Sequence, residues 1–197
     1  MKKNNRDGEP VESGLLSRAA KTETAKPDPA ISRLTGRGVR RIIGVDPGLA
    51  STGWGVVDYA DNRVRYIAHG CIETKADRPR AERLFFIYQA IREALETYKP
   101  AESAIETLYF ARNISSAMAV AEARGVLCMA LFQQGLPVYE FTPNAIKQAV
   151  VGQSQADKRQ VQEMIRIILG LPEIPKPDHA ADALGAAVCC AHTAMIG

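Results

Sequence analysis

Three shortages in the sequence exclude whole classes of protein. No uninterrupted apolar run approaches the roughly 20 residues that a transmembrane helix needs, and the polar N-terminus shows no apolar core of a secretory signal. Only 4 cysteines are present, and none stands in a Cys-x-x-Cys pair or near a histidine at zinc-finger spacing. We therefore expect a cytoplasmic protein that does not bind a membrane. We also expect buried free thiols at the cysteines, which lie in apolar sequence: Cys71, Cys128, Cys189 and Cys190.

Net positive charge is confined to the N-terminal part of the chain. Residues 1–40 carry 9 Lys/Arg and 5 Asp/Glu, a balance of +4 within the total of +3, which leaves −1 for residues 41–197. The first 40 residues also lack a sustained apolar period, so we expect a disordered basic tail before one domain at 41–197. Alternatively, the tail is an arm that touches DNA, with Arg37, Arg40 and Arg41 as its best members.

Apolar periodicity predicts an α/β domain. Alternating and continuous apolar runs predict strands at 41–46, 52–58, 63–73, 103–106 and 136–141. Helical spacing predicts helices at 80–98, 114–134, 157–169 and 179–193, and a short helix between Thr142 and Val150.

Some single residues predict local features of these helices. Asp157 and Asp178 stand where the last two helices begin, and we expect both to act as N-caps. Small side chains recur on one face of the helix at 114–134, at Ala117, Ala121 and Gly125. This face allows a close approach by the sheet or by a second subunit.

Four chemically active side chains stand at the ends of apolar elements. Asp46 ends the first strand and Glu106 ends the fourth. His179 and Asp182 are three residues apart, so they share a face at the start of the last helix, where the helix dipole stabilises an anion. Carboxylates are ligands for Mg²⁺ or Mn²⁺. Two such ions about 4 Å apart can hold the attacking water and the leaving oxygen of a phosphodiester.

Each of these residues also has a purely structural interpretation. Asp46 could be a turn residue before Pro47, and Glu106 could be a solvated loop acid. His179 could be a helix-start residue with a satisfied imidazole, and Asp182 could be an acid favoured by the helix dipole. Spacing in the sequence does not decide whether the four groups meet in space.

Several short motifs occur in a fixed order from about residue 41 to residue 192. They are Gly44-Val45-Asp46-Pro47-Gly48, Thr52-Gly53-Trp54-Gly55, Ala104-Ile105-Glu106, Ala111-Arg112-Asn113, Ala123-Arg124-Gly125-Val126, Lys147-Gln148-Ala149-Val150-Val151-Gly152 and Asp178-His179-Ala180-Ala181-Asp182-Ala183-Leu184. In content and order they resemble the RuvC-type Holliday junction resolvases. So many spaced matches are far more specific than a lone Asp-x-Gly.

The resemblance implies an RNase H-like fold, with a mixed five-stranded sheet flanked by helices. It implies a homodimeric, Mg²⁺-dependent endonuclease that makes paired nicks in a four-way DNA junction during recombination and repair. Asp46, Glu106, His179 and Asp182 take the positions of the catalytic and metal-binding residues, with two Mg²⁺ per site and Mn²⁺ as a substitute. His179, at a position where the family carries Asp or His, is either a direct ligand or a proton-transfer group. A branch-migration motor complex is the implied partner.

Basic and aromatic side chains near these motifs are candidates for DNA contact: Tyr109, Phe110, Arg112, Lys147, Lys158 and Arg159. The cations lie in loops or at helix starts, as phosphate contacts should, and Lys147 and Lys158 match basic positions that the family uses for DNA. An aromatic residue after the second carboxylate stacks on bases in the family, and Tyr109 takes that position here. Phe110 either joins it or packs into the core.

Two other functions fit parts of the sequence. An actin-like or sugar-kinase ATPase also has Asp-x-Gly followed by Thr-Gly, but it needs a second such loop and a much longer chain. A non-catalytic module that only holds junctions would explain the basic residues, but not four ligand-type residues. The preferred cleavage sequence depends on loop contacts and DNA deformability.

Overall fold

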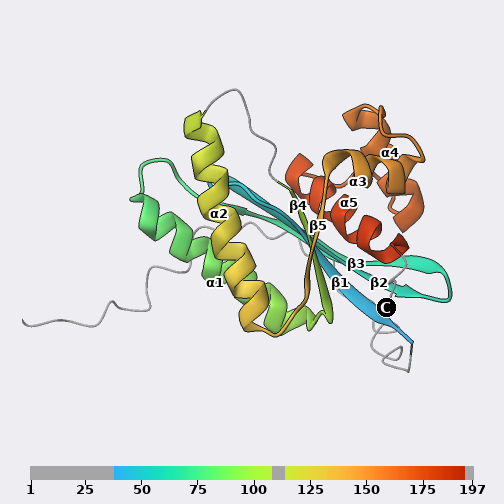
Figure 1. Cartoon of the computed structure of the whole chain (residues 1–197), viewed down its shortest axis with the longest axis horizontal. Coiled ribbons are helices and arrows are strands. Elements are labelled where there is room, and N and C mark those ends of the chain that lie inside the picture. The colour runs from blue at the N-terminus through green and yellow to red at the C-terminus, as the bar shows by residue number, and fades with distance from the viewer. Residues whose placement is uncertain (1–37, 108–113, 194–197) are drawn as a thin grey trace, which may run out of the picture.

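A mixed five-stranded sheet forms the centre of the structure, a computed structural model that describes residues 38–107 and 114–193 (Figure 1). The strand order is β3-β2-β1-β4-β5, in which β2 is antiparallel to both of its neighbours and β4 is parallel to both of its own. The strands are β1 (Arg40–Asp46), β2 (Ser51–Ala60), β3 (Arg63–Glu73), β4 (Glu102–Glu106) and β5 (Val138–Phe141). The predicted mixed sheet is confirmed.

Helices cover both faces of this sheet (Figure 1). One face carries α1 (Arg80–Tyr98) and α2 (Ile114–Gln133), and the other carries α3 (Pro143–Val151), α4 (Lys158–Leu169) and α5 (Asp178–His192). The helices lie close to their predicted positions, so the α/β prediction is also confirmed. Among the described residues, no helix has both the length and the apolar character needed to cross a membrane.

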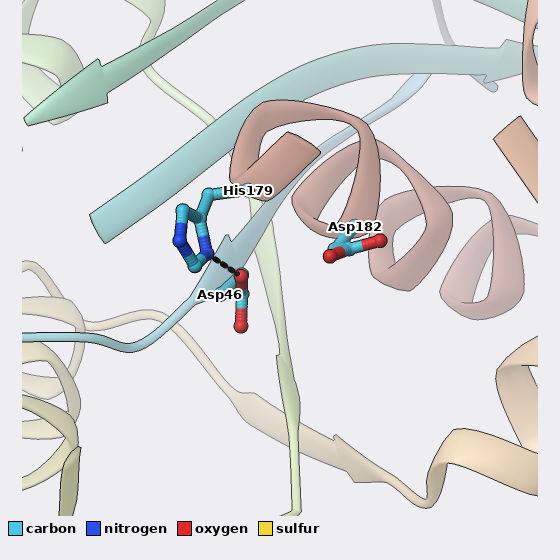
Figure 2. Close-up of side chains that lie close together, drawn as sticks. All are labelled: Asp46, His179 and Asp182. Carbon is cyan, nitrogen blue, oxygen red and sulfur yellow. Dashed lines mark hydrogen bonds and ion pairs between the residues drawn. The ribbon is translucent and has the colours of Figure 1, made fainter. Parts of the chain in front are cut away.

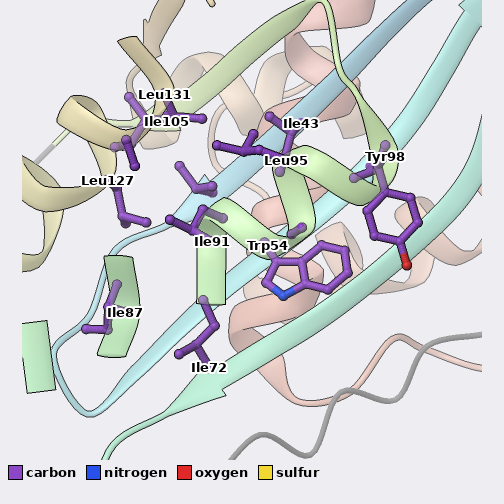
Figure 3. Packing of buried hydrophobic residues seen from close by; sticks show 14 of the residues in the cluster. Ile43, Trp54, Ile72, Ile87, Ile91, Leu95, Tyr98, Ile105, Leu127 and Leu131 are labelled. Atoms are coloured by element: carbon purple, nitrogen blue, oxygen red, sulfur yellow. The ribbon is translucent and has the colours of Figure 1, made fainter. Parts of the chain in front are cut away.

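The central strand β1 is buried on both faces, which explains its continuous apolar sequence. Ile43 packs toward α1 and α2 in a cluster that includes Ile91 and Leu127 (Figure 3). Ile42 points the other way, into the cluster around α5. Truncating such a fully buried isoleucine to alanine costs about 2–5 kcal/mol. The two clusters therefore fix the position of β1 and of Asp46 at its end.

The backbone of α5 lies directly against β1 and β2, because glycines occupy the contact points. A β-carbon on Gly44 would overlap the carbonyl oxygen of Ala183, and one on Gly53 would overlap the carbonyl oxygen of His179. Gly53 pairs with Asp46 across the two strands. The glycines therefore let the first turn of α5 reach the end of β1.

Two arginines at the start of β1 are held by carboxylates of the domain. Nε and Nη2 of Arg40 each donate to Glu102 at 2.6 Å, and the same atoms of Arg41 donate to Asp58 at 2.8 and 2.9 Å. Glu102 and Asp58 are buried, so removing either arginine would leave a buried charge unpaired. The hypothesis that Arg40 and Arg41 belong to a DNA-binding arm is therefore wrong. Arg37 lies outside the described residues.

The cysteines are free thiols, as predicted. Cys71, Cys189 and Cys190 are buried, whereas Cys128 on α2 is only half-buried. Burial raises the pKa of the Cys71 and Cys189 thiols to about 11, so they stay protonated at neutral pH. These thiols are therefore unreactive core side chains.

One face of α2 is apolar and open to solvent. Met118, Ala121, Gly125, Met129 and Phe132 follow one another at intervals of three or four residues, and all are exposed; we call this face the α2 stripe. A β-carbon on Gly125 would meet no atom within 4 Å. Ala117, the third small residue predicted on this face, is half-buried. The sheet is therefore not the partner of Ala121 and Gly125, and a second subunit stays a prediction.

Candidate functional site

Three elements that are far apart in the sequence meet at one edge of the sheet. Asp46 and Glu106 are the last residues of β1 and β4, which pair in parallel up to the residues before them. The carboxyl ends of both strands therefore lie side by side. The N-terminus of α5 reaches the same edge, because Gly53 leaves room for the backbone of His179.

Figure 2 shows Asp46, His179 and Asp182 gathered around one point. Nδ1 of His179 lies 2.7 Å from Oδ2 of Asp46, and one potential ligand atom from each of the three residues lies within 4.8 Å of the other two. Among the described residues, Glu106 does not join this close group, but Asp46 and Asp182 are near enough to shift the pKa of its carboxyl group. The four predicted site residues thus lie in one place.

The electrostatics of the site show crowded negative charge. Burial, followed by the charges of Asp46 and Asp182, raises the pKa of Glu106 to about 7. Burial also raises the pKa of Asp182, and the hydrogen bond with Asp46 raises the pKa of His179. A divalent cation would relieve this crowding, and carboxylate oxygens with one imidazole nitrogen are ligands suited to Mg²⁺ or Mn²⁺. The residues therefore fit a divalent metal ion.

A cavity of about 190 Å³ opens beside these carboxylates. Glu106 and Asp182 line it together with two cationic side chains, Lys147 of α3 and Lys158 of α4. The other lining residues are apolar or small: Pro143, Ile146, Val161 and Gly185. Two lysines next to carboxylates of this kind create a place in which a phosphate group can be held.

Lys158 is held between two acids of α5. Its Nζ lies 3.1 Å from Oδ2 of Asp182 and 3.1 Å from Oδ2 of Asp178. Burial opposes its charge, but the hydrogen bonds to these two carboxylates outweigh burial and raise the pKa of Lys158. The predicted N-cap role of Asp178 is wrong, because Pro177 occupies the N-cap position and no side chain caps α5. Asp178 instead accepts hydrogen bonds from Lys158 and Gln162 of α4.

The remaining candidates for DNA contact divide into two groups. Arg159 is exposed and follows Lys158 in the first turn of α4. Asp157 caps that turn, as predicted, through reciprocal hydrogen bonds with Gln160. The cap fixes the start of α4, from which the side chains of Lys158 and Arg159 extend. The others lie outside the described residues: Tyr109, Phe110 and Arg112.

Sequence reasoning missed two contributions to this site. Asp178 contacts Lys158, and a signal for this was present, since Asp178 and Asp182 are four residues apart and share a helix face that can hold a cation between them. The apolar wall of the cavity, including Ile146 and Val161, left no such signal. It exists only because α3, α4 and α5 pack together.

Comparisons with known proteins agree over the whole domain. The sequence profile of the family described as crossover junction endodeoxyribonuclease RuvC matches residues 42–190. A protein of that name from Treponema denticola is 54% identical over 147 residues, which span 75% of this chain and 83% of the relative. One from Chloroflexus aurantiacus is 48% identical over 154 residues, which span 78% of this chain and 94% of the relative.

Solved structures give the same result. RuvC of T. thermophilus in complex with a Holliday junction substrate matches with a TM-score of 0.73 and 36% identity, over 76% of this chain and 92% of that one. The yeast mitochondrial Holliday junction resolvase, at 13% identity and a TM-score of 0.54, shares the fold. The matched region contains the β1–β4 edge, the N-terminus of α5 and both cavity lysines. The chain therefore belongs to the RuvC family of crossover junction endodeoxyribonucleases.

Proposed function

We propose that this chain resolves four-way DNA junctions by paired nicks, with Asp46, Glu106, His179 and Asp182 as its catalytic residues. The observation that carries this proposal is the convergence of three ligand-type side chains within 4.8 Å, beside a cavity that two lysines share with Glu106. Family membership supports the substrate class, since one solved relative is in complex with a Holliday junction.

Asp46, Glu106, His179 and Asp182 would hold the metal, which we propose to be a pair of Mg²⁺ ions, with Mn²⁺ as a substitute. When bound, these ions supply Lewis-acid stabilisation of the phosphate and lower the pKa of water. The chain's own residues orient the side chains of the site and set their protonation. Asp46 orients the imidazole of His179 through the 2.7 Å contact, and partial burial of Glu106 raises the pKa of its carboxyl group.

Cationic side chains around the cavity place the DNA. Lys147 and Lys158 hold the scissile phosphate and stabilise the charge that develops on it. Arg159 and Arg112 contact phosphates to either side. Tyr109 and Phe110 stack on bases that are unpaired at the centre of the junction, where each stacked base contributes about 1–3 kcal/mol.

A second copy of the chain covers the α2 stripe in this proposal. Large apolar side chains lie at its ends and Ala121 and Gly125 lie between them, so two such helices can approach closely. A two-fold axis through this contact gives two active sites, which matches the two strands that must be cut in a four-way junction. A branch-migration motor as a partner and a cytoplasmic location remain predictions of the same proposal.

A labelled synthetic four-way junction, with a linear duplex of the same sequence, tests the activity in the presence of Mg²⁺. We expect the chain to convert the junction into two nicked duplexes and to leave the linear duplex intact. Asp46→Asn should slow cutting by about 100-fold or more, while junction binding persists. Cutting by this variant at the parental rate would contradict the proposed site.

Asp61→Asn is the matched control, because Asp61 is an exposed acid in the turn between β2 and β3, in a left-handed conformation that asparagine tolerates. It should cut at the parental rate. Tight binding without cutting by the parent would identify a non-catalytic junction-binding module. Hydrolysis of ATP without DNA would identify an actin-like ATPase.

A further inference from the structure

Asp178 stands next to the proposed site without belonging to it. It opens α5, its side chain is 64% exposed, and it does not cap the helix. Its carboxylate contacts α4 twice: Nζ of Lys158 lies 3.1 Å from Oδ2, and Nε2 of Gln162 donates to Oδ1 at 3.1 Å. Lys158 and Gln162 are four residues apart, so one face of α4 supplies both partners. Each oxygen of Asp178 therefore has its own partner on the neighbouring helix.

Lys158 stands at the N-terminus of its helix, where the helix dipole disfavours a cation. It is the first residue of α4, Arg159 follows it, and the first turn contains no acid after the N-cap Asp157, whose carboxylate already accepts from the backbone of Gln160. The N-terminus of a helix carries a partial positive charge that favours acids there and disfavours lysines. A lysine also has a flexible four-carbon stem that loses entropy when it is held in one place. Lys158 therefore depends on acids from another element, and α5 provides them.

The two acids of α5 that hold Lys158 are not equivalent. Asp182 is 29% exposed and belongs to the close group with Asp46 and His179, which fits a metal ion. Asp178 is more exposed and is not in that group. When Asp182 engages a cation, Asp178 is the acid that still holds Lys158 at the cavity.

We infer that Asp178 is a positioning residue, which keeps the ammonium group of Lys158 beside the cavity, where it meets the scissile phosphate. This inference rests on the proposed function and deepens it. Asp178 does not touch the substrate, because its negative charge would repel a phosphate. An exposed ion pair adds little to folding stability, so the effect of Asp178 falls on the rate of cutting.

Asp178→Asn tests this inference, because it removes the charge and keeps the shape of the side chain. At saturating junction and Mg²⁺, the single-turnover rate should fall about tenfold, since a poorly placed cation stabilises the transition state less well. The Kd for the junction should change less than twofold, and the unfolding midpoint should fall only slightly, through loss of one acid from the first turn of α5. Asp178→Glu should restore most of the rate. Glu173→Gln, which removes an exposed acid from the segment before α5, should have no effect.

A double variant separates this role from a direct effect of Asp178 on its neighbour His179. Lys158→Gln should be slow by itself, and adding Asp178→Asn to it should cause no further loss. If Asp178 acted through His179, the double variant would be slower than Lys158→Gln alone. That result, or a parental rate in Asp178→Asn alone, would overturn the inference.

A readout on the free protein keeps the inference separate from the proposed function. If the parent cuts no junction, the proposed function has failed. NMR of the lysine ammonium groups then decides the inference, with Asp182→Asn added to every protein so that Asp178 is the acid left to hold Lys158, and with Lys158→Gln used to assign the signal. We expect a resolved Lys158 signal in the parent and in Asp178→Glu, and loss of this signal by rapid exchange in Asp178→Asn. Identical spectra for the parent and Asp178→Asn would refute the positioning role.

Discussion

Gly53 lies directly against the carbonyl oxygen of His179, with no room for a β-carbon between them. This contact joins β2, the strand paired with the end of β1, to the first turn of α5. It therefore sets how close His179 comes to Asp46. The 2.7 Å contact at the centre of the site depends on a residue that has no side chain.

Gly53→Ala is expected to push the first turn of α5 away from the sheet. Overpacking of this kind costs about 1–3 kcal/mol of unfolding free energy. The accompanying shift of His179 should slow junction cutting by about 100-fold, because a misplacement of roughly 1 Å can have that effect. Urea denaturation and single-turnover cleavage measure the two consequences.

Gly185→Ala is the control within the same helix. A β-carbon there would meet side chains and not backbone, at 3.3 Å from the Cγ2 methyl of Ile146 and 3.3 Å from the Cδ1 methyl of Ile165. The gain of about 1 kcal/mol from replacing a helical glycine offsets this tight contact, so stability should stay within about 1 kcal/mol of the parent. An equal loss of stability in both variants would show that the contact between Gly53 and His179 is not special.

The predictable parts of the site are those that follow from local rules. Asp46 and Glu106 each end an apolar strand, and strands that are parallel neighbours bring such ends together. His179 and Asp182 share a face because they are three residues apart on a helix. The relations within one element depend only on spacing, whereas the strand order that brings Asp46 and Glu106 together was implied by the family resemblance.

The parts that could not be predicted depend on contacts between elements. An acid at a helix start usually acts as an N-cap, but Pro177 takes that position and leaves Asp178 free to contact α4. Arg40 and Arg41 look like members of a basic tail, yet Glu102 and Asp58 lie opposite them in the folded sheet. Neither partner is near in the sequence, so only the tertiary structure reveals the pairs.

Glu106 makes the metal-free protein less stable as the pH rises. Its pKa is raised from 4.5 to about 7, so the folded state binds this proton more tightly than the unfolded state does. The unfolding free energy therefore falls between about pH 4.5 and pH 7, by about 1–3 kcal/mol in total. Glu106→Gln removes this titration and should be more stable than the parent at pH 8. Urea denaturation in EDTA at pH 5 and pH 8 measures the difference.

Two controls make the Glu106 prediction specific. Glu93→Gln alters an exposed acid of α1 and should leave the pH dependence unchanged. Addition of Mg²⁺ should stabilise the parent at pH 8, since a cation relieves the same crowding of charge, and should stabilise Glu106→Gln less. A parental slope with pH in Glu106→Gln would contradict the raised pKa.

His179 should titrate above its ordinary pKa of 6.5 in the metal-free protein, chiefly because of its hydrogen bond with Asp46. A raised histidine pKa contributes stability below pH 6.5 that is lost as the pH rises through the folded-state pKa. Asp46→Asn should lower this pKa, because burial then opposes the charged imidazole. Asp182→Asn should lower it less. NMR titration of the histidine ring signals measures both shifts, and an unchanged pKa in Asp46→Asn would contradict the assignment.

Met129→Lys should separate the two subunits that we propose to meet at the α2 stripe. Met129 is 58% exposed in the single chain, so the lysine costs the folded monomer little, but it places a charge inside an apolar interface, where burial is costly. Sedimentation should therefore show monomers, and the two nicks in a junction should lose their coupling. Ile167→Lys is the matched control, since Ile167 is 56% exposed but lies on α4, on the other face of the sheet. It should sediment as the parent does. If Met129→Lys also sediments as a dimer, the subunits meet elsewhere, because no dimer held by the α2 stripe could keep that charge out of its interface.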